Sequence, residues 1–66
     1  MINAELTQIK INKALESFKR AEYQDSIHIL ENLEEKNSNF LICWYLGHSY
    51  FRIYDYFKAI EYIKNQ

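Results

Sequence analysis

Residues 55–60 read DYFKAI, and residues 22–27, which lie 33 positions earlier, read EYQDSI. Both stretches place an acid, a tyrosine, two variable positions, a small residue and an isoleucine in the same order. The match extends outward at the same offset, because Phe18-Lys19-Arg20 corresponds to Phe51-Arg52-Ile53. Self-similarity at a period of roughly 33 or 34 residues is typical of solenoids that stack pairs of helices. The sequence therefore predicts an internal repeat made of two helical hairpins.

The composition of the chain favours helix throughout. The chain has no proline and a single glycine, Gly47, so the two residues that most often interrupt helices are nearly absent. The clearest break is Asn-Ser-Asn at 37–39, whose side chains favour turns and helix N-caps. Asp55 is a second expected N-cap. Apolar residues at helical spacing complete the pattern, and we expect four helices at about residues 4–20, 23–36, 39–53 and 56–65.

A chain of 66 residues forms one small domain, and such a chain buries only about 60% of its unfolded surface. Small domains therefore gain stability from disulfides, metals or partner chains. Cys43 is the single cysteine, which excludes a disulfide within the chain and favours a reducing compartment. Cys43, His28 and His48 are too few and too scattered for a structural zinc site. We expect no cofactor, and a partner chain, another copy or further sequence is left as the candidate stabiliser.

The charge of the chain disfavours two classes of partner. Its net charge is −1, with 8 basic and 9 acidic residues, whereas nucleic-acid binding normally needs a basic face. The longest apolar run, Phe40 to Leu46, is far shorter than the about 20 residues of a membrane-spanning helix. The N-terminal residues lack the basic start and apolar run of a signal peptide. We expect a cytoplasmic protein that binds neither membranes nor nucleic acid; a nucleic-acid-binding helical bundle is the weaker alternative.

The sequence does not assemble a recognisable catalytic site. Ser49 follows His48, but no base and orienting group stand in the arrangement that activates a serine. Glu34-Glu35 falls at a solvated helix end. Cys43 lies on an apolar helix face, where we expect it to be buried and inert. We therefore expect a protein that is not an enzyme, without catalytic, cofactor-binding or metal-binding residues.

The second half of the chain resembles a tetratricopeptide repeat. The residues that carry the family's pattern are, in order, Leu46-Gly47, Tyr50, Asp55-Tyr56 and Ala59-Ile60. The first half is a more divergent copy, with Ala14 at the glycine position and Ser26 at the alanine position. Cys43 stands at the family's usual tryptophan site, and Tyr54 replaces a frequent glycine between the helices. Small residues at the glycine and alanine positions let two helices of a hairpin approach closely.

This resemblance implies an all-α fold of two antiparallel helical hairpins, stacked as a short α-solenoid of four helices. It covers almost the whole chain, which we expect to be a single domain over residues 1–66. The first repeat spans about residues 6–38 and the second about residues 39–66, with its second helix truncated at Gln66. The implied function is a protein-interaction module: an adaptor, an inhibitor, an immunity-type protein or part of a longer repeat array.

In proteins that this sequence resembles, peptides lie along the first helix of each repeat. The matching positions that we expect to bind another protein or peptide are Asn12, Leu15, Lys19, Leu41, Trp44, Tyr45, His48 and Arg52. Gln8 and Ile11 fall on the same strip. Ile11 and Trp44 stand where one subset of the family uses cations to hold a C-terminal carboxylate, so we do not expect that clamp. Aromatic and aliphatic anchors beside cations suit a protein partner, and an ordinary solvated helix face is the alternative interpretation.

Nine of the eleven aromatic residues lie at or after Phe40. We expect Tyr50, Tyr56 and Phe57 in the core of the second hairpin. The remaining aromatics exceed what one hairpin can cover, so we expect some of them to be exposed or covered by another chain: Trp44, Tyr45, Phe51, Tyr54 and Tyr62. The alternative function is therefore structural: a self-associating helical protein whose aromatic C-terminal face forms a homo-oligomer, for example a homodimer through Tyr54, Tyr62 and Ile63.

Overall fold

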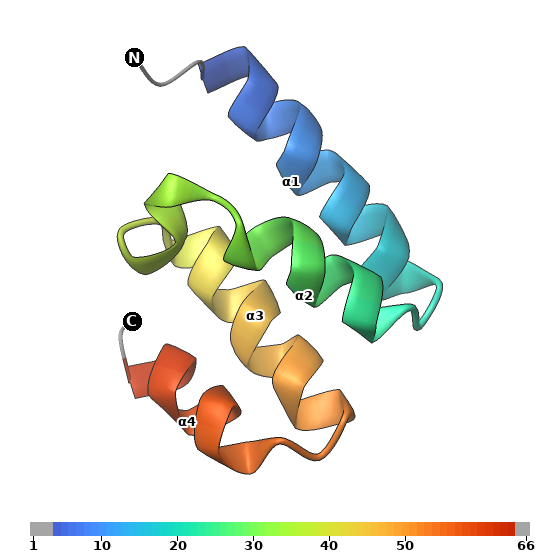
Figure 1. Ribbon diagram of the computed structural model, residues 1–66, viewed down its shortest axis with the longest axis vertical. Coiled ribbons are helices and arrows are strands. Elements are labelled where there is room, and N and C mark those ends of the chain that lie inside the picture. The colour runs from blue at the N-terminus through green and yellow to red at the C-terminus, as the bar shows by residue number, and fades with distance from the viewer. Residues whose placement is uncertain (1–3, 65–66) are drawn as a thin grey trace.

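The computed structural model describes residues 4–64, which contain helices and no strand (Figure 1). The elements are α1 (Ala4–Lys19), α2 (Tyr23–Glu31), the short 3₁₀ helix η1 (Glu34–Asn37), α3 (Phe40–Arg52) and α4 (Tyr56–Lys64). The predicted all-α class with four α-helices is confirmed for these residues. The expected end of the fourth helix at residue 65 lies outside the described residues.

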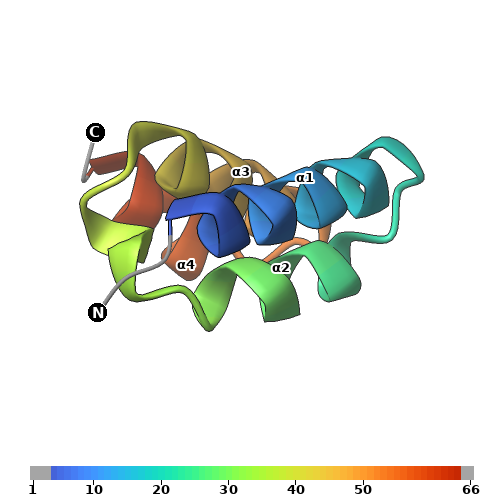
Figure 2. The same ribbon diagram turned by 90° about the horizontal axis from the view of Figure 1, so that it is seen from above.

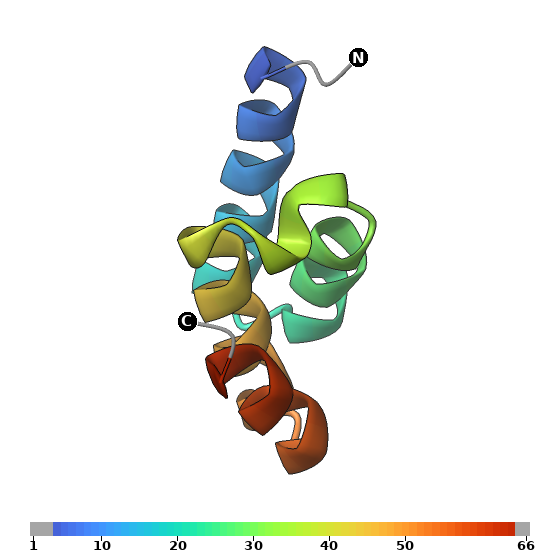
Figure 3. The same ribbon diagram turned by 90° about the vertical axis from the view of Figure 1, so that its left-hand side faces the viewer.

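The helices form a small stack of two hairpins. The first hairpin pairs α1 with α2, and the second pairs α3 with α4. Between the hairpins, α3 packs more extensively against α2 than against α1. Successive α-helices run in alternating directions and follow one another along the longest axis of the molecule (Figure 1). α1 and α3 lie on one side of the stack and α2 lies on the other (Figures 2 and 3). The first helices of the two hairpins thus share one face.

The turns inside the two hairpins have the same geometry. Ala21 and Tyr54 adopt positive φ angles of 64° and 69°, a conformation that usually ends helices at glycine. After each of them, the next amide donates to the carbonyl five positions back, at 2.8 Å in the first turn and 2.9 Å in the second. Since Ala21 and Tyr54 are 33 residues apart, the repeat of the sequence is also a repeat of the backbone.

Side-chain caps begin both helices of the second hairpin. The Oδ1 atom of Asn39 accepts from the amides of Leu41 and Ile42, at 3.0 and 3.3 Å, before α3 begins. The Oδ1 atom of Asp55 accepts from the amide of Lys58 at 3.2 Å, before α4 begins. These bonds satisfy amides that have no partner inside the helix. The expected N-cap at Asp55 is confirmed.

Small residues lie where the helices of each hairpin meet. Ala14 and Ser26 are buried in the first hairpin, and Gly47 and Ala59 are buried in the second. A Cβ atom on Gly47 would lie 3.0 Å from Cγ1 of Ile63 and 3.5 Å from the carbonyl oxygen of Ala59. The backbones of α3 and α4 therefore approach closely at Gly47.

One apolar core runs through both hairpins; its buried members are Ile11, Ala14, Ile27, Leu30, Leu33, Ile42, Cys43, Leu46 and Tyr62. The expected burial of Cys43 is confirmed. Its Sγ atom donates to the carbonyl of Lys36 at 2.8 Å, and burial raises the pKa of the thiol above its ordinary value. The protonated thiol therefore serves here as a packed core group.

The second helix is shorter than predicted. It ends at Glu31, and Glu34–Asn37 forms the separate helix η1 in place of a continuation to residue 36. The Nδ2 atom of Asn32 donates to the carbonyl of His28 at 2.7 Å, a side-chain bond that competes with the helix. Leu33 then adopts extended backbone angles and turns into the core. Burial of Leu33 therefore outweighs the local helix propensity of the segment.

Two aromatic residues that we expected in the core are outside it. Tyr56 is about half exposed and Phe57 is 93% exposed, whereas Tyr50 is half-buried. The inward face of α4 is formed by Ala59 and Tyr62, three positions apart, and Phe57 lies on another side of the helix. Tyr62, which we expected among the uncovered aromatics and in a homodimer surface, is only 5% exposed. The ring of Tyr62 is therefore a core residue of the single chain.

Candidate protein-binding face

Four ring side chains gather where α1 and α3 share a face. Phe18 of α1 lies 5.2 Å from the ring of Tyr45 and 6.4 Å from the ring of Trp44, between centroids. Trp44 in turn lies 4.8 Å from Tyr45 and 3.9 Å from the imidazole of His48. All four residues are half-buried. We call Phe18, Trp44, Tyr45 and His48 the α1–α3 cluster.

Helical spacing explains the cluster. Trp44 and His48 are four residues apart on α3, so they lie one turn apart on one face. The edge-on contacts of Tyr45 with Phe18 and Trp44, at 81° and 73°, match the geometry that aromatic pairs prefer. Contacts of this kind hold the rings in fixed positions while part of each ring is left accessible to a partner.

A cation extends this face toward the turn of the first hairpin. The ring of Phe18 contacts Tyr23 at 5.4 Å, and the guanidinium carbon of Arg52 lies 5.8 Å from the centroid of Tyr23. That distance is within the range of a cation–π interaction. Arg52 is exposed at the C-terminal end of α3, and Lys19 is exposed at the corresponding end of α1.

The structure brings together half of the predicted binding residues: Trp44, Tyr45, His48 and, through Tyr23, Arg52. Leu41 is about half exposed on α3, one turn before Tyr45. Asn12 is exposed and accepts a hydrogen bond from Nε2 of Gln8 at 3.0 Å.

Leu15 and Ile11 contribute to the core. Leu15, half-buried, packs against the core cluster. Ile11, expected on the binding strip, is buried, because the inward face of α1 includes Ile11 and Ala14. The binding strip on α1 is therefore narrower than the sequence pattern implied.

Phe18 and Tyr23 are members of the face that the sequence analysis did not single out. Phe18 ends the apolar stripe of α1, and Tyr23 begins α2 just after the turn. A short loop places the end of one helix beside the start of the next. The predicted hairpin therefore already implied that Phe18 and Tyr23 lie close together.

A polar cluster, separate from the α1–α3 cluster, centres on Glu31 at the end of α2. Its carboxylate accepts hydrogen bonds from the hydroxyl of Tyr50, from the hydroxyl of Tyr62 at 2.8 Å and from Nζ of Lys36 at 2.9 Å. Burial alone would raise the pKa of Glu31, but the hydrogen bonds from these three groups outweigh it and the pKa lies below its ordinary value. Burial, and then the bond to Glu31, raises the pKa of both tyrosines. The cluster joins the two hairpins and is a structural feature.

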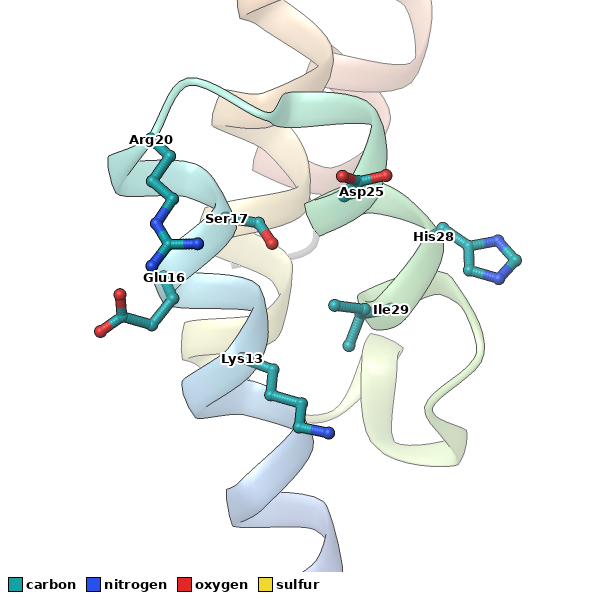
Figure 4. A pocket seen from close by; sticks show the side chains of 7 residues that line it. All are labelled: Lys13, Glu16, Ser17, Arg20, Asp25, His28 and Ile29. Atoms are coloured by element: carbon teal, nitrogen blue, oxygen red, sulfur yellow. The ribbon is translucent and has the colours of Figure 1, made fainter.

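A shallow pocket of about 690 Å³ lies between α1 and α2; it is lined by Lys13, Glu16, Ser17, Arg20, Asp25, His28 and Ile29 (Figure 4). Ile29 points into the space between the helices, whereas His28 points away from it (Figure 4). The lining carries charges of both signs on exposed side chains. It lacks the convergent buried polar groups that would orient a small molecule.

The described part of the chain has neither a candidate metal site nor a candidate membrane span. Among residues 4–64, no three His, Cys, Asp or Glu side chains gather in a group that could hold a metal ion. No helix of this segment is long and apolar enough to cross a membrane. Comparisons of the chain with protein-family models, with curated proteins and with solved structures found no match.

Proposed function

We propose that the protein is a non-catalytic interaction module of tetratricopeptide type that binds a protein or peptide on the face shared by α1 and α3. The α1–α3 cluster is the observation that carries this proposal. It combines a half-buried tryptophan, tyrosine and histidine beside Arg52. Trp, Tyr and Arg are the residues most enriched at the energetic centres of protein interfaces.

The tetratricopeptide type is supported by the repeated geometry of the two hairpins. The αL residues Ala21 and Tyr54 and the small residues at the helix crossings follow the same 33-residue offset as the sequence. We infer a cytoplasmic setting from the lone, protonated Cys43, since secreted small domains commonly depend on disulfides.

The face has a direction, because its two ends differ. Leu41 supplies an exposed aliphatic side chain near the start of α3, whereas Lys19 and Arg52 supply cations at the ends of α1 and α3. The rings of Trp44 and Tyr45 lie between these ends. A partner segment with aliphatic or aromatic anchors, followed by acidic residues, matches this order. Its apolar groups would be buried on the rings, and its carboxylates would pair with the cations.

Selection of peptides from a random display library on the immobilised chain tests this proposal. Trp44 is the single tryptophan, so its fluorescence reports binding at the cluster directly. We expect selected peptides to carry acidic residues beside apolar anchors, and Arg52→Ala to weaken their binding about tenfold, a loss of about 1.4 kcal/mol. Phe57→Ala, which removes an exposed aromatic from α4, is the control and should leave affinity unchanged. Peptides that bind without changing Trp44 emission and without sensitivity to Arg52 would contradict the proposal.

A further inference from the structure

The two hairpins differ in how their equivalent residues are covered. In the first hairpin, Ile27 and Leu30 are buried in the core that α3 completes, and the ring of Phe18 contacts Trp44 and Tyr45 of α3. The equivalent positions in the second hairpin lie 33 residues later. Phe18, Tyr23, Ile27 and Leu30 correspond, in that order, to Phe51, Tyr56, Ile60 and Ile63. Each of these four side chains is about half exposed. We call Phe51, Tyr56, Ile60 and Ile63 the α4 stripe.

The α4 stripe is one continuous surface at the end of the stack. Tyr56, Ile60 and Ile63 follow steps of four and three residues, so they share one side of α4. Phe51 extends the stripe onto α3, because its ring lies 5.5 Å from the ring of Tyr56. α4 is the last helix along the molecule's long axis, away from the first hairpin (Figure 1). The stripe is thus the place where a third hairpin would begin if the stack continued.

The opposite end of the stack has a different chemistry. Lys13, Glu16 and Ile29 line the pocket of Figure 4, on the first hairpin. Their equivalents 33 residues later, Leu46, Ser49 and Tyr62, are buried, and Leu46 and Tyr62 belong to the core that runs through both hairpins. Lys13 and Glu16 therefore hold charges at positions that the second hairpin uses for close packing. A copy added head-to-tail would bury these two charges under apolar side chains, which is unfavourable.

We propose that two copies of the chain pair through their α4 stripes about a twofold axis that passes beside Ile60. A twofold interface brings the same surface of both copies together and buries no charge of the opposite end. Ile60 is the central residue of α4, so antiparallel pairing of the two α4 helices places Ile60 against its own copy. The same pairing brings Lys64, at the end of one α4, toward Asp55 at the start of the other, where opposite charges attract.

The exposed apolar area sets the expected strength of such a pair. A fully buried aromatic side chain contributes on the order of 150–250 Å². Because each residue of the α4 stripe is about half exposed, the stripe offers roughly 400 Å² per copy, and the neighbouring Tyr54 adds to it at one edge, so the pair falls in the range of small, weak interfaces. The pairing leaves the α1–α3 cluster free, so it does not rest on the proposed function.

Sedimentation equilibrium of the full chain tests the pairing. Over concentrations from about 1 µM to about 1 mM, which span weak to moderate affinities, the mass should rise from 8.1 kDa toward twice that value. A mass that stays at 8.1 kDa over the whole range would overturn the proposal. A mass that grows past the dimer without a plateau would overturn the twofold arrangement, because that growth indicates head-to-tail association.

Matched variants locate the surface. Ile60 and Ile9 are 53% and 52% exposed and lie on the last and the first α-helix, so Ile60→Glu and Ile9→Glu make the same change at opposite ends. Ile60→Glu should be monomeric at all concentrations with an unchanged helical circular-dichroism spectrum, and Ile9→Glu should dimerise like the wild type. The reverse pattern would overturn the assignment. Ile60→Ser, which adds no charge, should weaken pairing at least fivefold and provides a second readout if the glutamate variant unfolds.

A mixing experiment tests the twofold axis itself. The axis places residue 60 of one copy against residue 60 of the other, so Ile60→Glu and Ile60→Lys should each be monomeric alone and should form a heterodimer when mixed. A mixture that remains monomeric, while Ile60→Ser still pairs, would show that residue 60 does not meet its own copy.

Discussion

At the scale of single residues, Ala21 and Tyr54 occupy backbone positions that suit glycine better. Their φ angles of 64° and 69° lie in the left-handed region, where a side chain costs roughly 1–2 kcal/mol. Both residues end the first helix of a hairpin, where that conformation reverses the chain. Ala21 is exposed in its turn. The chain therefore keeps a local strain at both turns that its other contacts offset.

Glycine at position 21 should stabilise the protein. Ala21→Gly removes the strain but adds freedom to the unfolded chain, so we expect a net gain of about 0.5–1 kcal/mol, or a melting temperature higher by about 2–8 °C. Ala14→Gly is the control: Ala14 is buried inside α1, and its loss should destabilise by about 1 kcal/mol or more. Thermal unfolding measures both. A lower melting temperature for Ala21→Gly would mean that the αL strain is absent.

The burial of individual residues could be predicted in part from the sequence. Cys43 and the cap at Asp55 follow from local pattern alone. The inward face of α4 could also have been predicted. The small residue Ala59 marks the place where the helices cross, and Tyr62, three positions later, lies on the same side of the helix. We instead assigned Tyr56 and Phe57 to the core by resemblance. Both are exposed, because Ala59 and Tyr62 form the side of α4 that is buried.

At the scale of elements, the contact between α3 and α4 depends on Gly47. Alanine in a helix interior is favoured over glycine by about 1 kcal/mol, yet a Cβ atom on Gly47 would lie 3.0 Å from Cγ1 of Ile63. Ile63 is about half exposed and can move, but it lies on the α4 stripe. Helix propensity and packing therefore oppose each other at this position.

A double-mutant cycle separates these two effects. Gly47→Ala alone should change the free energy of unfolding by less than about 1 kcal/mol, since the propensity gain is offset by the contact. In the Ile63→Ala background, where Cγ1 is removed, Gly47→Ala should stabilise by about 1 kcal/mol. Urea unfolding of the four proteins measures the coupling. Equal effects of Gly47→Ala in both backgrounds would contradict the close approach of α3 and α4.

The end of α2 is an element boundary that could not be predicted from the sequence. Residues 34–36 are Glu-Glu-Lys, which favour helix, and the single local signal against continuation is Asn32, whose side chain bonds to the carbonyl of His28. In the structure Leu33 enters the core, and Glu35 accepts a hydrogen bond from Oγ1 of Thr7 on α1 at 2.9 Å. Both contacts join parts of the chain that are distant in sequence. The periodicity of apolar residues within one segment therefore could not predict them.

At the scale of the whole molecule, the Glu31 cluster ties the hairpins together and makes stability depend on pH. The pKa of Glu31 is lowered in the folded protein, so its contribution is present above its ordinary value of 4.5 and is lost as pH falls through the lowered value. The pKa values of Tyr50 and Tyr62 are raised, so their contributions are present below pH 10.0 and are lost as pH rises above it. Stability should therefore be highest between these limits.

The alkaline side gives a specific test. Each tyrosine that is ionised only when unfolded lowers stability by up to about 1.4 kcal/mol per pH unit above its ordinary pKa. Tyr62→Phe keeps the ring but removes one ionising hydroxyl, so the fall in stability above pH 10.0 should be about half as steep as in the wild type. Glu31→Gln should remove most of the cluster's acid-side dependence. Denaturant unfolding at several pH values measures both, and an unchanged alkaline slope in Tyr62→Phe would contradict the cluster.

The architecture of the whole molecule was largely predictable, because the 33-residue offset fixes two equivalent hairpins. The difference between the two ends was also present in the sequence, since Lys13 and Glu16 stand where the second copy has Leu46 and Ser49. Its meaning became clear only from the structure, in which Leu46 and Ser49 are fully buried. The extent of the binding face was less predictable, because the ring contacts join helices that are distant in sequence.

The central claim is that α1 and α3 form the face that binds a partner. Amide chemical-shift mapping of the ¹⁵N-labelled chain with a display-selected peptide tests it most directly. We predict the largest shifts at Lys19, Trp44, His48 and Arg52, with little change at Ile60. Shifts concentrated on Phe51, Tyr56 and Ile60 instead would contradict the claim and would assign partner binding to the α4 stripe.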